Sequence, residues 1–328
     1  MANNFRILDA GQGKRKIPET SDKAYRQISL FLQERTVEMR KSIGCYLILV
    51  SLGPLYSKAQ QTSKFDDNFN LWNIQKGQQA TVFAAKAYIR AQPNLKAAII
   101  DSLSLGNNVT INSSPFKGNT IKNFYAPWYE ISYSDGNAKK TGFIWLGLLA
   151  LGKQSATDGS QYVYGFERFL KSTNEQDEDR FLTVVKLLDA NGNLRAEQSF
   201  PFAYSEQTIS QSKLLSAMGL QNVKQIIRIE FLGEACGVTS EYNYVAWTGL
   251  QLVNLPSRYS VGDAGVYYYD EKILFPSEHG KNNQIIYKYI EEGEVIDDNA
   301  ENPNFRVTKK KEQFQWSGTG FEKLTTSN

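Results

Sequence analysis

The stretches AYIRAQP (87–93), IIDSLSLG (99–106) and VTI (109–111) predict three short β-strands, separated by a proline turn and a Gly-Asn-Asn turn. Two further segments, WYEISY (128–133) and TGFIWL (141–146), flank the polar turn SDGN (134–137). In each segment apolar residues nearly alternate with polar ones, as expected for strands with one buried face. Five short strands in about sixty residues, with turn signals between them, are what a small closed barrel needs. We therefore predict a mainly β fold that begins with such a barrel over residues 80–152.

The same stretch, residues 87–149, resembles the bacterial SH3-like domain. The resemblance rests on YIRxxP (88–93), on IxxLxxGxxV (100–109), and on WYxI (128–131) followed by GFI (142–144). It implies an SH3-like barrel in which 112–127 is a long loop and the ligand groove lies near the loops. It also implies a cell-wall peptide or glycan as partner, because peptidoglycan stem peptides are the family's usual association.

Four aromatic residues of the predicted barrel are candidate ligand contacts. Aromatic faces stack on sugar rings or on proline-like peptide surfaces, and Tyr and Trp add a polar group at the rim. The candidates are Tyr88, Trp128, Tyr133 and Trp145. At least half of such residues in so small a barrel should belong to the core. We expect Trp128 and Ile131 to point inward, and Tyr88 and Tyr133 to lie on the surface.

A secretory signal peptide is predicted at residues 39–59. Met39-Arg40-Lys41 is a basic opening, 43–55 is an apolar run of 13 residues, and SKA (57–59) is a small-x-small cleavage site. The run is shorter than the 20 or so residues of a membrane span, so we expect no stable span after cleavage. Residues 1–38 are interpreted as a false upstream extension; a cytoplasmic segment ahead of a short anchor is the alternative. The mature protein, with an N-terminal segment at 60–79, is then periplasmic or extracellular.

The charge distribution argues against nucleic acid as a partner. The whole chain carries a formal charge of +3, but residues 1–59 hold ten Lys and Arg against five Asp and Glu. Residues 60–328 therefore hold 27 basic and 29 acidic residues. Such a balance does not predict a surface for polyanions.

Beyond the barrel the chain stays rich in predicted strands. The polar segment KQSATDGS (153–160) is interpreted as a linker, and 161–328 as a larger β-rich C-terminal domain, arranged as part of a propeller or as a sandwich. Residues 181–188 and 194–200 predict a hairpin around DANGN (189–193). A calcium loop is less consistent with this turn, because the sixth-position glycine and the twelfth-position glutamate are missing.

Two more elements are predicted after this hairpin, together with one weak repeat. SKLLSAMGL (212–220) predicts a short helix that ends at Gly219, and 223–232 predicts a strand. Residues 242–252 and 312–321 share an aromatic-x-x-Trp-x-Gly core, with the two tryptophans 69 residues apart. Each is interpreted as a hairpin that turns at glycine, which suits propeller units or the faces of a sandwich. The motifs GEACG (233–237), GDAGV (262–266) and ILFP (273–276) resemble uncharacterised secreted proteins of Bacteroidota that carry an SH3-like module.

No catalytic constellation stands out, and we predict that the protein is not an enzyme. A thiol hydrolase needs a Cys and a His base, which could only be Cys236 and His279, but no helix is predicted at the cysteine to lower its pKa. We expect a buried Cys236 and an exposed His279. Zinc sites need more His or Cys ligands than are present, so neither metal nor cofactor is predicted. Glycoside hydrolysis remains an alternative, because it uses a pair of carboxylates and Glu234, Asp263 and Glu271 are candidates.

Three exposed features remain outside these motifs. At most Tyr267 and Tyr269 share a solvent face, because residues alternate along a strand. The acidic stretch 291–298 is interpreted as a solvated loop, and Lys309–Lys311 as a strand edge protected by lysines.

The function expected from the whole sequence is a secreted, non-catalytic binding or scaffold protein of the bacterial cell envelope. The alternatives are a cell-wall hydrolase with an unrecognised site, or a sensor or inhibitor whose partner is an envelope protein.

Overall fold

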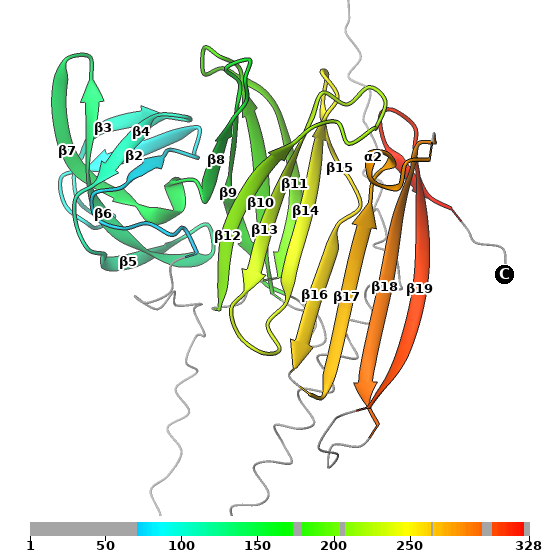
Figure 1. Cartoon of the computed structure of the whole chain (residues 1–328). Coiled ribbons are helices and arrows are strands. Elements are labelled where there is room, and N and C mark those ends of the chain that lie inside the picture. Colours follow the sequence, from blue (N-terminus) through cyan, green and yellow to red (C-terminus); the bar gives the residue numbers. More distant parts are fainter. Residues whose placement is uncertain are drawn as a thin grey trace, which may run out of the picture. The chain divides into compact units, whose positions relative to one another are not determined.

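The computed structural model describes residues 71–172, 179–203, 207–263, 265–281, 283–296 and 304–324. The predictions for 1–38 and 39–59, and those for 60–70 within the N-terminal segment, lie outside the described residues. Within the described ranges no helix is long and apolar enough to cross a membrane. The described residues form a mainly β fold, with three antiparallel sheets and one short α-helix (Figure 1).

The first sheet follows the strand order β1-β4-β6-β7-β2-β3, with β5 paired to β6. Strands are found at all five predicted places between residues 87 and 146. The bounds are β1 Gln79–Thr81, β2 Lys86–Arg90, β3 Ile99–Ser104, β4 Asn108–Ile111, β5 Phe116–Ile121, β6 Phe124–Asp135 and β7 Ala138–Trp145, followed by a 3-10 turn at Leu146–Leu148.

Two details of the first sheet differ from the expectation. Its pairing path runs from β1 to β3 without closing, so the described residues form no closed barrel. The segment 112–127, expected as one long loop, contains β5, which folds back on β6 with Ile121 opposite Phe124. The two residues of this hairpin turn, Lys122 and Asn123, have φ of 53° and 67°. Two positive φ angles are typical of the type I′ turn, whose twist matches that of the flanking strands. The turn is hard to predict from the sequence because it lacks the usual Asn-Gly pair.

The second sheet has four strands in the order β11-β10-β9-β8, and the third has nine in the order β12-β13-β14-β16-β17-β18-β19-β20, with β15 paired to β14. The bounds are β8 Gly152–Ser155, β9 Gln161–Leu170, β10 Arg180–Leu188, β11 Leu194–Ala203, β12 Thr208–Leu215, β13 Gln225–Gly233, β14 Ser240–Trp247, β15 Leu252–Asn254, β16 Arg258–Asp263, β17 Tyr267–Leu274, α2 Pro276–His279, β18 Ile285–Val295, β19 Phe305–Trp316 and β20 Phe321–Lys323.

The hairpin around residues 189–193 and the strand at 223–232 are confirmed as β10–β11 and β13. The predicted helix at 212–220 is wrong. Residues 208–215 pair along their full length with β13, with Leu214 opposite Ile227, so the neighbouring strand supplies the backbone hydrogen bonds that a helix would supply internally. Within the segment interpreted as a linker, Lys153–Ser155 belongs to β8 and pairs with β9.

The two tryptophan hairpins are confirmed. Trp247 ends β14 and Trp316 ends β19, and each strand turns back through a glycine with positive φ, Gly249 at 96° and Gly318 at 92°. Both hairpins belong to the same nine-stranded sheet, where Gln251 Nε2 approaches the carbonyl of Thr319 at 3.5 Å. The propeller alternative is therefore wrong for the described residues, because continuous pairing joins what separate blades would keep apart.

The second sheet packs against the β12–β15 part of the third. Phe202 of β11 and Phe231 of β13 stack with ring centroids 3.8 Å apart, inside one buried apolar cluster. Side chains also bridge both edges, since Gln154 donates to the carbonyl of Ser212 and Asn254 donates to the carbonyl of Ser199, both at 2.9 Å. These contacts join the second sheet to the third both in the core and at the sheet edges.

The first sheet contacts the other face of the second sheet through Phe83. The Phe83 ring lies against Gly165, where an added Cβ would come within 2.8 Å of it. Lys186 is buried and donates from Nζ to the Phe83 carbonyl at 3.1 Å, with the ammonium 4.1 Å from the ring centroid. Burial lowers the pKa of Lys186, because it disfavours the charged form.

Candidate ligand groove

Three of the four aromatic residues expected to contact a ligand lie in the core. Trp128 and Trp145 are 1% and 0% exposed, and Ile131 is fully buried, so the inward orientation of Trp128 and Ile131 is confirmed. Tyr133, expected on the surface, is buried at 5% exposure. Tyr88 is 45% exposed, as expected, with Lys86 Nζ 5.4 Å from its ring centroid. Tyr88 is thus the one candidate of the four whose ring a ligand could reach.

Hydrogen bonds explain why these buried aromatics stay inside. Trp145 Nε1 donates to the carbonyl of Ala126 at 2.8 Å, and Trp128 Nε1 donates to Asn119 Oδ1 at the same distance. The Tyr133 hydroxyl donates to Asp101 at 3.0 Å. Their polar atoms are satisfied within the first sheet, so burial of the rings leaves no unpaired donor.

Cys236 and His279 are not arranged as a catalytic pair. Cys236 is exposed in the turn between β13 and β14, contrary to the expected burial, because the turn carries it away from the core. His279, expected to be exposed, is half-buried in α2 beside Tyr287, with ring centroids 4.8 Å apart. Both of its nitrogens are engaged, Nε2 with the carbonyl of Ile285 and Nδ1 with the N–H of Lys281. A base needs a free nitrogen near its nucleophile, and His279 has none.

The carboxylates considered for glycoside hydrolysis have separate surroundings. Glu271 is buried and accepts hydrogen bonds from Lys288 Nζ at 2.7 Å, the Tyr269 hydroxyl at 2.9 Å and the Tyr259 N–H at 3.0 Å. Glu234 is exposed beyond the end of β13, and Asp263 ends β16. Glu271 thus has a structural role, and no described contact joins it to the other two.

Tyr267, Tyr268 and Tyr269 do not form an open aromatic surface. Their hydroxyls donate to Glu292, Glu291 and Glu271 respectively. Tyr269 is only 5% exposed. The carboxylates of β18 therefore bind the tyrosines of β17 instead of lying in a solvated loop; Asp297 and Asp298 lie outside the described residues.

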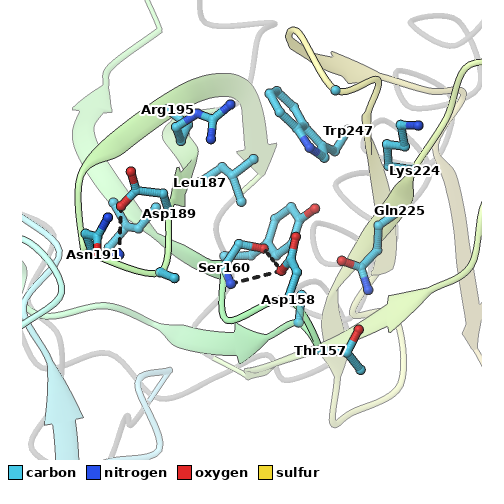
Figure 2. A pocket seen from close by; sticks show the side chains of 15 residues that line it. Thr157, Asp158, Ser160, Leu187, Asp189, Asn191, Arg195, Lys224, Gln225 and Trp247 are labelled. Atoms are coloured by element: carbon cyan, nitrogen blue, oxygen red, sulfur yellow. Dashed lines mark hydrogen bonds between the residues drawn. The ribbon is translucent and has the colours of Figure 1, made fainter.

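A groove of about 650 Å³ opens between the turns at one end of the second and third sheets (Figure 2). Four segments line it: the β8–β9 turn, the β10–β11 turn, the start of β13 and the β14–β15 turn. Its lining includes Thr157, Asp158, Ser160, Tyr162, Asp189, Asn191, Arg195, Lys224, Gln225 and Trp247. This volume lies in the range of small-ligand sites, which extends from about 300 to 1,000 Å³.

Two aspartates shape the walls of the groove by capping their own turns. Asp158 accepts hydrogen bonds from the Ser160 hydroxyl at 2.6 Å and the Ser160 N–H at 2.9 Å. Asp189 accepts from the N–H groups of Asn191 and Asn193, both at 2.9 Å. The Ser160 bonds lower the pKa of Asp158, and those from Asn193 and Asn191 lower the pKa of Asp189. Both carboxylates are therefore ionised at neutral pH and held in place.

An aromatic ring and a phenol complete the groove. Trp247 is half-buried, packs against the apolar core and is fixed by a hydrogen bond from the Lys224 N–H to its carbonyl at 2.8 Å. Tyr162 is 1% exposed overall and lines the groove, and its hydroxyl has no hydrogen-bond partner among the described residues. Burial, together with the nearby Asp158 carboxylate, raises the pKa of Tyr162. The phenol therefore stays protonated and can donate a hydrogen bond to a ligand.

The charged groups of the groove balance. Asp158 and Asp189 line the groove together with the cationic residues Arg195 and Lys224, all four of which are labelled in Figure 2. The groove thus offers one aromatic ring for stacking, together with hydrogen-bond donors and acceptors. Its two anionic and two cationic side chains leave no net charge. Across the described ranges, no cluster of three His, Cys, Asp or Glu side chains could hold a metal ion.

Most of the groove was missed from the sequence. The sequence predicts a hairpin at Trp247 and a turn at Asp189, but no local pattern links either residue to a ligand. The signal present was the pair of Asx turns, Asp-Gly-Ser at 158–160 and Asp-x-Asn at 189–191, each of which projects polar groups from a hairpin end. Comparison of the chain with protein families, curated proteins and solved structures finds no match.

Proposed function

We propose that this protein is a secreted, non-catalytic binding protein of the bacterial cell envelope, and that its ligand lies in the groove lined by Trp247 and Tyr162. The ligand class that fits best is a hydroxyl-rich glycan chain such as the peptidoglycan backbone. The single observation that carries the proposal is a half-buried indole beside polar side chains that include two acidic and two basic residues, so that their formal charges cancel. Sugar rings offer C–H faces for the indole and hydroxyls for the polar groups, whereas a strongly charged ligand would meet both signs.

The absence of catalysis is part of the proposal, and the pKa values of the groove support it. Glycoside hydrolysis needs one carboxylic acid whose pKa is raised, so that it can protonate the leaving oxygen. Asp158 and Asp189 have lowered pKa values and both cap turns. To act as acid or nucleophile, either aspartate would have to give up the hydrogen bonds to its own turn. Loss of those bonds would destabilise the turns that shape the groove.

The finer architecture belongs to the same proposal. The first sheet is interpreted as an incompletely closed SH3-like module, supported by strands at the five predicted places and by the bridge that pairs Val82, after β1, with Leu149, after the 3-10 turn. The second and third sheets are interpreted as a sandwich, supported by the stack of Phe202 on Phe231. In this reading the SH3-like module contributes rigidity, and the sandwich end contributes the ligand site.

The test is retention of the purified protein on insoluble peptidoglycan, followed by analysis of the released muropeptides. Trp247→Ala removes the stacking surface, and Arg195→Gln removes an exposed donor with little effect on folding. Each is expected to weaken retention, Trp247→Ala by about tenfold or more. Tyr88→Ala, in the first sheet, serves as the matched control and should retain normally. No new muropeptides are expected.

Two results would contradict the proposal. Loss of retention in Tyr88→Ala, with Trp247→Ala unaffected, would move the ligand site to the first sheet. New muropeptides from the wild-type protein would establish an active site and the hydrolase alternative.

A further inference from the structure

The β2–β3 hairpin of the first sheet, residues 86–104, exposes a group of aliphatic side chains at its tip. Leu95 is 43% exposed, and Ile99 and Ile100 are each 51% exposed. Ile100 is the extra residue of a β-bulge, since Ile89 pairs with Asp101 and Arg90 pairs with Ile99. A bulge turns a side chain out of the regular pleat, which accounts for two adjacent exposed isoleucines.

The backbone of this tip is satisfied by its own hydrogen bonds. The Ala91 N–H donates to the Ala98 carbonyl at 2.9 Å, and Arg90 Nη1 donates to the Ala97 carbonyl at 2.7 Å. Asn94 accepts from the Lys96 N–H through its side chain at 3.0 Å and from the Ala97 N–H through its carbonyl. A tip with paired polar groups can enter a medium of low dielectric at little cost.

The charged side chains of the hairpin are mainly cationic, because its one carboxylate, Asp101, is bonded to Lys140 Nζ and to the Tyr133 hydroxyl, both at 3.0 Å. Lys86, Arg90 and Lys96 lie on the hairpin, no acidic residue occurs between 86 and 100, and none of the three cations has a carboxylate partner in the described part of the chain. Residues 71–151 as a whole hold eight Lys and Arg against three Asp and Glu. This excess complements an anionic partner.

The free edge of β3 is unsuited to an added peptide strand. The outward N–H of Ser102 is bonded to Asp101 Oδ1 at 2.8 Å, and the N–H of Ser104 to Asn107 Oδ1 at 2.8 Å. The short bulged stretch at Ile99 and Ile100 has no such side-chain hydrogen bond to its backbone. A partner that requires no backbone hydrogen bonds fits this surface better than a strand would.

We propose that the β2–β3 hairpin docks the protein onto the surface of an anionic lipid bilayer. Leu95, Ile99 and Ile100 enter the interfacial region, while Lys86, Arg90 and Lys96 contact lipid phosphates. This contact is peripheral and uses a part of the molecule separate from the groove. It would hold an envelope-binding protein at the membrane, independently of what the groove binds.

Flotation of the full chain with vesicles tests this proposal. One set of vesicles contains phosphatidylcholine alone, and the other contains equal parts of phosphatidylcholine and phosphatidylglycerol. The wild-type protein should float with the anionic vesicles, and added salt should reduce the bound fraction. Ile99→Ser with Ile100→Ser should lower the partition constant about tenfold. Lys86→Gln with Lys96→Gln should lower it about fivefold for each cation removed.

Leu194→Ser is the matched control, because Leu194 is 50% exposed in β11, away from the hairpin. Residues 43–55 are also apolar, so all comparisons are made among variants that share them. Equal flotation of the wild type and the hairpin variants would overturn the proposal, as would failure of the wild type to float. Capture by an acidic polyglutamate peptide without flotation would overturn it in favour of an acidic protein partner.

Discussion

Trp145 of the first sheet and Trp247 of the groove are the same residue type in opposite situations. Trp145 is fully buried, and its Nε1 donates to the carbonyl of Ala126 and to that of Asn119. Trp247 ends a strand at a turn, so one part of its ring packs on the core while another lines the groove. An aromatic residue in this protein therefore contributes stability or recognition according to its place along the strand, and not according to its type.

The same contrast holds for the carboxylates. Asp101 of the first sheet binds Tyr133 and Lys140 and so ties three strands together. Asp158 and Asp189 bind only their own turns and keep one side toward the groove. Asp101 therefore links strands of the first sheet to one another, whereas Asp158 and Asp189 hold turns that line the groove.

The strongest test of this contrast is Trp145→Ala. It removes a buried ring and both of its hydrogen bonds, and should lower the free energy of unfolding by about 3–5 kcal/mol. Urea denaturation followed by circular dichroism measures the change. The matched control Tyr88→Ala, at an exposed ring of the same sheet, should change it by less than about 1 kcal/mol. A loss below about 1 kcal/mol for Trp145→Ala would mean that this tryptophan is not part of the core.

Lys186→Met tests the contact between the first and second sheets. The pKa of Lys186 is lowered by burial, so the wild-type folded state binds fewer protons than the unfolded state between that pKa and the ordinary value of 10.5. The stability contributed by Lys186 is therefore fully present above 10.5 and is lost as the pH falls through the lowered pKa. We expect the wild type to gain unfolding free energy relative to Lys186→Met as the pH is raised toward 10.5, and urea denaturation at a series of pH values measures the difference. Lys213→Met, at an exposed lysine, should show no such change.

Tyr133→Phe probes the polar group that holds an aromatic ring inside the first sheet. It removes the hydrogen bond to Asp101 and should cost about 1 kcal/mol at neutral pH. Burial, followed by the Asp101 carboxylate, raises the pKa of Tyr133 to about 12. Its stabilisation is thus fully present below the ordinary value of 10.0 and is lost as the pH rises toward 12. Absorbance at alkaline pH should show one late-ionising phenol missing in the variant; an unchanged titration would mean that Tyr133 is open to solvent.

Arg195→Gln should have the smallest effect on stability and a clear effect on the groove. Arg195 is exposed, so the free energy of unfolding should change by less than about 0.5 kcal/mol. Retention on peptidoglycan should nevertheless fall, because a donor that lines the groove is lost. Arg168→Gln, exposed on β9 outside the groove lining, is the control. Equal retention of both variants would show that Arg195 does not take part in ligand binding.

Much of the strand content was predictable because it depends on local patterns. The alternation at 128–133 and at 223–232, and the Asn-Gly turn at 191–192, each correspond to a strand or hairpin in the structure. The errors arose where local and long-range signals disagree. Residues 212–215 have a helical composition, but pairing with β13 prevails. At 116–121 the strand was hidden by polar residues that face outward, and its turn lacks the usual Asn-Gly pair.

The candidate site was less predictable than the fold. Aromatic residues were chosen in the first sheet because they are dense there, yet density is also what a small core requires, and Trp128, Tyr133 and Trp145 are buried. The groove residues come from hairpins up to about ninety residues apart, between Ala156 and Gly249. No local pattern links them.

Local sequence patterns alone predict a mainly β protein, the places of most strands and turns, and the lack of a familiar catalytic constellation. These features follow from side-chain periodicity and from the φ angles that turn residues prefer, which act over a few neighbours. The three-dimensional structure is needed to establish which aromatics are buried, which carboxylates are held by turns, and which hairpin ends meet in a groove. Burial and proximity depend on how sheets pack, and packing is set by contacts between strands far apart in the chain.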